Sequence, residues 1–361
     1  MAGSAGDTGA MGSRGRERTF DRLTRLVAAG LGTTDLIDEA GVLLATAVPH
    51  DCGCWHTTDP DTLIETGFRA HHMPPPDAEV ARFAYLPDDF NSFVRLAGAQ
   101  RRAGVLTEAT EGRLERSVRY RELLRPNNIR GELRVALVAD GMCWGNISLF
   151  RGTPHDFTAD EAEFAHQVAG VLGQGLRTAG VRARAAVDGG TAWPGVLVLG
   201  ASGEVIAASG PARAWLAELG APGAPDLAPL PFAVLALAER ARMEGQAASR
   251  VLGTGGRWVS LHASATAVDV RPAGFEVSLV LQQANPGAVA PLLYAAFGFT
   301  AREREIVELV VRGCSTAEVA ERLFISPLTV QTHLTSIFGK AGVRSRRQLT
   351  GLIHADGAGL D

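Results

Sequence analysis

The residues best suited to chemistry in the first half of the chain are two histidines and two cysteines at alternate positions: His50, Cys52, Cys54 and His56. Alternate side chains share one face of a β-strand, and imidazole and thiolate groups are ligands that zinc prefers. Four ligands in one row would extend over about 20 Å at ~3.3 Å per residue, too far for a single tetrahedral ion. We therefore expect buried sheet residues here, with a metal or redox site as the less favoured alternative.

Sequence motifs for nucleophilic or phosphate chemistry are missing. The sequence has no G-x-x-x-x-G-K-[ST] loop, no G-x-S-x-G elbow and no H-E-x-x-H pair. The two remaining cysteines, Cys143 and Cys314, complete no C-x-x-C pair. We therefore predict that the chain is not an enzyme, and its sequence indicates no cofactor and no bound metal.

A second group of chemically suited residues lies near the C-terminus, on the exposed side of an expected helix. Its centre is formed by Gln331, Thr332 and Thr335. Glutamine can pair with adenine through two hydrogen bonds, and threonine can bond a base edge or contact the methyl group of thymine. Side chains suited to phosphate flank this face, namely Ser326, Thr329, Lys340, Arg344 and Arg346. These residue types favour a surface that reads double-stranded DNA.

The charge distribution supports this interpretation, although the total does not. The 35 basic and 39 acidic residues give a net charge of −4, whereas nucleic-acid binders are usually basic. Residues 322–355, however, contain five basic side chains and no acidic one, so the rest of the chain carries −9. A basic segment at the end of an acidic body is suited to the phosphate backbone of DNA.

Capping chemistry locates the helices that must position this surface. Capping boxes, in which Ser or Thr is followed three residues later by Glu or Gln, are expected at Thr300, Ser315 and Ser345. Ser326 followed by proline predicts a further helix start, and Gly313 predicts a helix end. Only about three residues separate the second and third of these helices, the arrangement of a helix-turn-helix.

Two further domains are expected in front of these helices, because 361 residues suggest two or three domains at about 150 residues each. Residues 18–187 read as helices around an antiparallel sheet, with a hairpin over 132–152 and a long helix from Thr158. A polar helix is expected over 113–126. Residues 191–285 read as a smaller mixed domain, which the turn at 285–287 ends.

The two ends of the chain and its hydropathy complete this outline. Residues 1–17 read as a disordered Gly/Ala/Ser tail without the apolar stretch of a secretion signal, and 290–361 read as wholly helical. No apolar run approaches the ~18 residues that a membrane-spanning helix needs. We therefore expect a cytoplasmic protein without a membrane partner.

Residues 299–353 resemble the LuxR-type helix-turn-helix domain of bacterial transcription regulators. The likeness is carried by the T-x-x-E opening at Thr300, Gly313, the stretch AEVAERLFIS, Thr329-Val330, His333 and the KxGVxSR pattern from Lys340. It implies that residues 327–339 form the helix that enters the major groove. It also implies that the last helix offers a dimer surface, through Leu349, Leu352 and Ile353. The expected partners are a second copy of the chain, an approximately palindromic operator and RNA polymerase.

The first domain resembles a GAF domain, through residues 54–63, 119–126 and 143–151, and the second resembles a PAS-like fold, through residues 196–209. The expected fold class is thus an α+β GAF-like domain, an α+β PAS-like domain and an all-α helix-turn-helix domain. The resemblance implies a sequence-specific transcription regulator whose front modules sense a ligand or partner and control how the last domain is presented. The alternative is a small-molecule or redox sensor that acts mainly through protein partners.

Overall fold

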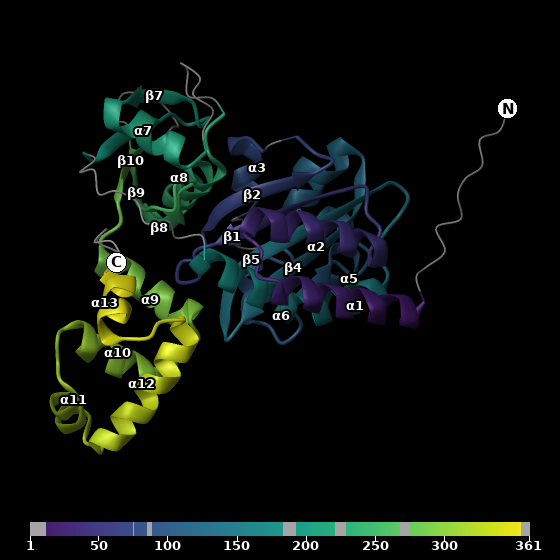
Figure 1. Ribbon diagram of the computed structural model, residues 1–361. Coiled ribbons are helices and arrows are strands. Elements are labelled where there is room, and N and C mark those ends of the chain that lie inside the picture. Colours follow the sequence, from purple (N-terminus) through teal and green to yellow (C-terminus); the bar gives the residue numbers. More distant parts are fainter. Residues whose placement is uncertain are drawn as a thin grey trace.

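The computed structural model describes residues 12–74, 76–84, 89–182, 193–220, 229–267 and 275–354. These residues form two five-stranded antiparallel sheets, each with its own helices, and a helical C-terminal part (Figure 1). This confirms the predicted fold class. Within the described residues, no helix has both the length and the apolar character needed to cross a membrane. Residues 1–11 of the expected disordered tail lie outside the described residues. The prediction is wrong for residues 13–17, which form the start of a helix that continues to Ala28.

The sheet of the N-terminal domain has the strand order β2-β1-β5-β4-β3. Its strands are β1 (Cys52–Thr58), β2 (Glu65–His71), β3 (Ala103–Val105), β4 (Ile129–Ala139) and β5 (Met142–Gly152). The predicted hairpin is confirmed, because β4 and β5 pair across a turn at Asp140 and Gly141. Both turn residues have positive φ angles, of 48° and 77°, as tight hairpin turns require.

The two faces of this sheet differ in character. Trp55, Leu133 and Ile147 point to one face, where they share a buried core with α1 (Ser13–Ala28), α2 (Thr33–Ala47) and α6 (Ala159–Arg182). On the opposite face, strand pairing puts Cys54 beside Ser148 and Ser148 beside Arg134. This second face is therefore polar, although it too is buried.

Short elements cover the polar face: α3 (Ala78–Ala84), α4 (Phe93–Gly98), α5 (Leu106–Ala109), η1 (Leu114–Arg116), η2 (Tyr120–Leu124) and η3 (Arg125–Asn127). The single polar helix predicted over 113–126 is wrong, since three short turns of different pitch occupy this stretch. The cause is that Ser117 and Arg119 point inward and bind Asp89. Both are at most 1% exposed.

The central domain repeats the strand order of the first, as β7-β6-β10-β9-β8. Its elements are β6 (Gly195–Leu199), β7 (Val205–Ala208), α7 (Gly210–Glu218), α8 (Phe232–Glu244), β8 (Gln246–Leu252), β9 (Trp258–Ala267) and β10 (Phe275–Gln283). Helix α8 is buried along almost its whole length, because it packs on β8 and β9 of its own sheet and on β2 and α3 of the N-terminal domain. Its first seven residues, FAVLALA, are apolar on all sides, as expected for a helix segment packed between two domains.

The C-terminal part contains α9 (Pro286–Ala296), α10 (Ala301–Val311), α11 (Thr316–Leu323), α12 (Pro327–Ala341) and α13 (Arg346–His354). The capping boxes predicted for α10 and α11 are both present, and Ser326 caps α12. The turn expected at 285–287 is instead the start of α9: Asn285 accepts a hydrogen bond from the Ala288 amide and Pro286 is the first helical residue. An Asn-Pro pair is a helix-start signal, so this helix could have been predicted.

Candidate functional sites

The connection between α11 and α12 is a tight turn. Phe324 ends α11 in the left-handed conformation, with a φ of 54°, and Ser326 begins the capping of α12 two residues later. Val319, Val330 and Ile337 are fully buried and hold the two helices against α10. The fold therefore fixes the start of α12 relative to the rest of the helical core.

The outer side of α12 carries the residues that the sequence indicated for base contacts. Gln331, Thr332 and Thr335 are all exposed, so no other described part of the chain covers them. The hydroxyl of Thr332 donates to the Leu328 carbonyl, and that of Thr335 donates to the Gln331 carbonyl, both at 3.1 Å. Their oxygen lone pairs are left to accept hydrogen bonds from outside.

The residues indicated for phosphate contacts fall into two groups. Ser326, Thr329 and Arg344 are exposed at the two ends of α12. Lys340 instead binds Glu303 at 2.6 Å and the Gly298 carbonyl at 3.0 Å. Arg346 donates to the Cys314 carbonyl at 2.7 Å and to the Thr316 hydroxyl at 2.9 Å. These last two cations therefore brace the helical core in this conformation.

The carboxylate that binds Lys340 is unusually acidic. Glu303 is 3% exposed, and burial alone would oppose its ionisation. Hydrogen bonds from Lys340, the Thr300 amide and the Ser336 hydroxyl outweigh that effect and lower the pKa of Glu303 to about 2. The charged pair links the beginning of α10 to the end of α12.

Helix α13, indicated as a dimer surface, lies against its own chain. Leu349 and Ile353 are at most 2% exposed and share a core with Val289 and Leu293 of α9. Leu352 is half-buried. Helix α9 therefore covers the apolar side of α13 in this conformation, so a second copy could reach these residues only after α9 had moved.

A cavity of about 490 Å³ lies on the polar face of the first sheet. Cys52, Cys54 and His56 line it from β1, so the alternation of these side chains onto one face is confirmed. His50 precedes the strand and binds the Val48 carbonyl at 2.8 Å. Apolar side chains form much of the remaining wall: Phe68, Met73, Val80, Phe83, Phe93, Leu123, Leu124, Ile129, Phe150 and Phe232.

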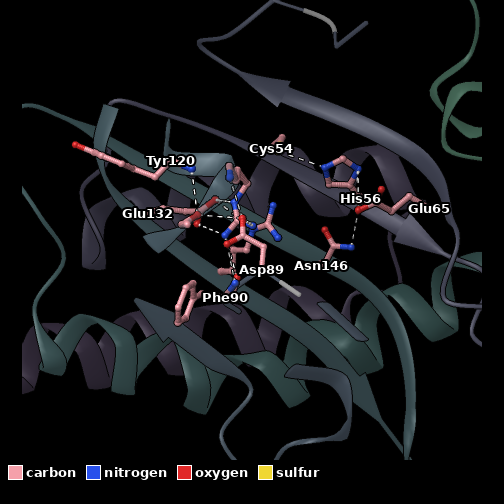
Figure 2. A network of polar contacts seen from close by, with 11 residues as sticks. Cys54, His56, Glu65, Asp89, Phe90, Tyr120, Glu132 and Asn146 are labelled. Carbon is pink, nitrogen blue, oxygen red and sulfur yellow. Dashed lines mark hydrogen bonds and ion pairs between the residues drawn. The ribbon is translucent and has the colours of Figure 1, made fainter. Parts of the chain in front are cut away.

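One side of the cavity is built around Arg119, whose partners Asp89, Phe90 and Glu132 are labelled in Figure 2. Its guanidinium donates to Glu132 at 2.9 and 2.7 Å, to Asp89 at 3.0 Å and to the Phe90 carbonyl at 3.0 Å. Burial opposes its charge, but the two carboxylates raise the pKa of Arg119 above its ordinary value. Each of its three nitrogens donates at least one hydrogen bond, so Arg119 holds the loops over the sheet.

The other side contains Cys54, His56 and Glu65 (Figure 2). His56 lies 3.3 Å from the Cys54 sulfur and 3.8 Å from Glu65, which also accepts a hydrogen bond from Asn146. Burial lowers the pKa of His56 and raises that of Cys54 to about 12. The Cys54 thiol is therefore protonated at neutral pH. Among the described residues, no group of three or more His, Cys, Asp or Glu side chains is arranged to hold a metal.

Residues 298–353 match the model of the luxR family of bacterial regulatory proteins, and residues 15–176 match the GAF domain model. The chain carries a LuxR-type helix-turn-helix domain behind a GAF domain.

Curated relatives match the LuxR-type domain over about 50 residues. An HTH-type transcriptional regulator of Mycobacterium bovis is 54% identical over 50 residues, which are 14% of this chain and 6% of that protein. The spore germination protein GerE of Bacillus subtilis is 47% identical over 49 residues, 14% of this chain and 66% of that protein. The solved VqmA dimer of Vibrio cholerae aligns with 34% of this chain and 60% of that one, at 18% identity and a TM-score of 0.16. A score this low carries no structural argument.

The GAF domain contacts both later domains. Phe232, at the start of α8, lines the GAF cavity and lies 5.0 Å from the His56 ring and 5.3 Å from the Phe68 ring, centre to centre. The LuxR-type domain is reached through α6, where Arg177 pairs with Asp140 and donates to the Ala295 carbonyl of α9 at 3.5 Å.

A single arginine joins all three domains. Arg250 of β8 binds Asp59 at 2.7 and 2.9 Å and Asp61 at 2.6 Å, both in the β1–β2 connection of the GAF domain. Its remaining nitrogen donates to the Ala288 carbonyl of α9 at 2.6 Å. Asp59 is 1% exposed. Helix α9 is thus held by both front domains while it covers α13.

Sequence reasoning did not find Arg119, Glu132 or Arg134. The last two alternate with Leu133 and Val135 on β4, a pattern that is typical of a strand with one face in solvent. Their burial depends on loops that come from elsewhere in the chain. One local signal could have indicated their burial: β4 places the charged side chains of Glu132 and Arg134 within an otherwise mostly apolar strand.

Proposed function

We propose that this chain is a sequence-specific DNA-binding transcription regulator that acts as a homodimer. The observation that carries the proposal is the open outer side of α12 in a domain matched to the luxR family. Gln331, Thr332 and Thr335 would contact base edges, and Ser326, Thr329 and Arg344 would contact phosphates. Lys340 and Arg346 would contribute to phosphate binding from their braced positions.

The GAF domain and the central, PAS-like domain would sense a small ligand or a partner. The cavity of about 490 Å³ has the size of small-molecule sites, which range over about 300–1,000 Å³. A ligand that changes the position of Phe232 would shift α8, and through β8 and Arg250 it would reach α9. Release of α9 would uncover Leu349, Leu352 and Ile353 for dimerisation. The ligand can drive this release only if it binds the arrangement with α9 released more tightly than the arrangement in which α9 covers α13.

Selection of bound duplexes from a random library by the full-length chain tests the DNA-binding part. We expect an approximately palindromic site with half-sites about 10 base pairs apart. A Gln331→Ala variant should keep binding but relax one position of each half-site. Gln167→Ala is the matched control, because Gln167 is an exposed glutamine on α6 of the GAF domain. Equal binding of random and selected duplexes across a salt series would refute sequence-specific recognition.

The alternative is a sensor that works mainly through protein partners. It is favoured only by the size of the two front domains and the GAF cavity. Deletion of residues 290–361 separates the two functions, because the alternative predicts that the biological effect persists without them.

A further inference from the structure

The GAF cavity contains one buried charged group whose hydrogen bonds are not all used. Arg134 lines the cavity with a side chain that is 6% exposed, and its Nε and Nη1 atoms have no hydrogen-bond partner. The nearest carboxylate oxygen to Nε is Oε1 of Glu132, at 3.2 Å, which already accepts a hydrogen bond from Arg119. A buried N–H group without an acceptor is costly, and more so on a charged group.

The strand register shows which side chains lie in line with Arg134 across the neighbouring strands, and none of them carries a negative charge. Arg134 lies opposite Ser148, and Ser148 lies opposite Cys54, so the three side chains form one row across the cavity floor. The other two members are small and neutral at pH 7. Phe93 lies on the guanidinium, with its ring centre 4.6 Å from Cζ. One face of Arg134 is thus covered, and the side chain forms part of the cavity lining.

The size and the walls of the cavity define the rest of the ligand. A protein cavity of about 150 Å³ lined by aliphatic and aromatic side chains is enough to bind benzene. The present cavity is about 490 Å³, with aromatic side chains from three directions: Phe68 on β2, Phe150 on β5 and Phe232 on α8. It therefore has room for two fused rings or a medium-length alkyl chain beyond the charged end.

We propose that the GAF cavity binds a small carboxylic acid with an aromatic or aliphatic body, whose carboxylate accepts hydrogen bonds from Arg134. Guanidinium and carboxylate groups match in shape and charge, which makes this pairing stronger than one with a neutral acceptor. Arg119 is not the anchor, because its Nε, Nη1 and Nη2 atoms already donate to Glu132, Asp89 and the Phe90 carbonyl. The assignment of a ligand class rests on the sensory role proposed above.

The charge balance of the cavity adds a second consequence. Arg119 and Arg134 face three carboxylates, those of Glu65, Asp89 and Glu132. Asp51, Asp77 and Arg151 also line the cavity, so an incoming carboxylate adds to a negative excess. His56 is placed to compensate, since its unpartnered Nδ1 lies 3.8 Å from Glu65. The other groups around His56 are Cys54, Asn146, Phe68 and Phe232, which are uncharged, and Arg134, whose positive charge lowers the pKa of His56. A carboxylate bound to Arg134 would offset that effect. Binding of the acid should therefore take up a proton and become tighter as the pH falls from 8 to 6.

Calorimetric titration of the full-length chain tests this proposal with benzoate, 2-naphthoate and decanoate, and with their primary amides as neutral analogues. We expect at least one acid to bind about tenfold more tightly than its amide at pH 6. Its affinity should be several-fold weaker at pH 8, whereas that of the amide should not change. Binding of none of the acids, or binding of each amide as tightly as its acid, would overturn the proposal. So would equal affinity for the acid at both pH values.

Variants locate the anchor. Arg134→Gln should weaken the acid about tenfold and leave the amide unchanged, while Arg134→Lys should retain part of the preference for the acid. Arg69→Gln on β2 of the same sheet is the matched control, because Arg69 pairs with Asp38 at the surface. Equal weakening of acid and amide by Arg134→Gln contradicts the assigned contact. If Arg134→Gln does not fold, the role of Arg134 is tested with Arg134→Lys and with the acid–amide comparison on the unmodified chain. DNA binding is measured separately on the same preparation, so failure of acid binding leaves the DNA-binding proposal standing.

Discussion

Lys340 and Glu303 form the contact that ties the end of α12 to the start of α10, and its strength can be worked out from the structure. The pKa of Glu303 falls from an ordinary value of 4.5 to about 2. At about 1.4 kcal/mol for each tenfold change in the ionisation constant, the ionised carboxylate contributes about 3 kcal/mol to the folded state. Lys340 is one of three donors and its side chain is 33% exposed, so solvent screens its share. We therefore expect Lys340→Met to cost about 1–2 kcal/mol at pH 7.

The pH dependence has a definite sign. The folded-state pKa of Glu303 lies below the unfolded one, so its contribution is complete above about pH 4.5 and is lost as the pH falls toward 2. Between pH 6 and pH 3.5, the unmodified chain should lose about 1.4 kcal/mol relative to Glu303→Gln, which lacks the titrating group.

Hydrogen exchange measured by mass spectrometry on peptides from α10 and α12 gives the local opening free energy in the full-length chain. Lys340→Met is compared in the unmodified and Glu303→Gln backgrounds, which isolates the pairwise energy. We expect a coupling of about 1–2 kcal/mol that shrinks below pH 4.5. A cost of Lys340→Met that is the same in both backgrounds would refute the reasoning, because the lysine would then stabilise the domain without its carboxylate.

Four further outcomes follow from individual contacts. Gln331→Ala should relax base preference in duplex selection without changing the salt dependence of binding, since its contact is with a base edge. Arg344→Met should weaken all duplexes alike and lower the slope of log affinity against log salt by about one; an unchanged slope would remove it from the phosphate contacts. Arg250→Met should increase hydrogen exchange in α9, because one guanidinium joins Asp59, Asp61 and the Ala288 carbonyl, and unchanged exchange would exclude it as the link. Cys54, with a pKa of about 12, should resist alkylation at pH 8 in the folded chain; rapid labelling there would contradict its burial.

Local signals in the sequence were sufficient for the helix-turn-helix. Ser and Thr caps, a proline at the first helical position and Gly313 depend on neighbours within four residues, so their effect does not need the rest of the fold. The exposed positions of α12 follow from helical spacing alone. The hairpin of β4 and β5 was predictable for the same reason, because its turn is specified by two adjacent residues.

Long-range contacts account for what could not be predicted. Lys340, assigned to phosphate by its position, binds a carboxylate 37 residues away. Leu349 and Ile353 are covered by α9, a helix whose start at 285–287 was predicted to be a turn. The helix expected over 113–126 is broken because Arg119 is drawn to carboxylates on other elements. Spacing within one segment carries no information about such partners.

The amino-acid sequence by itself determined where the helices of the C-terminal domain begin and which side of α12 faces outward. It also determined that residues 322–355 carry a positive charge in an otherwise acidic chain. Only the tertiary structure decided that both front domains share one strand order, that Arg134 lines a cavity and that Arg250 joins three domains. The physical reason is the range of the interactions. Caps and turns are satisfied by backbone groups a few residues away, whereas the burial of a charge depends on every segment that folds over it.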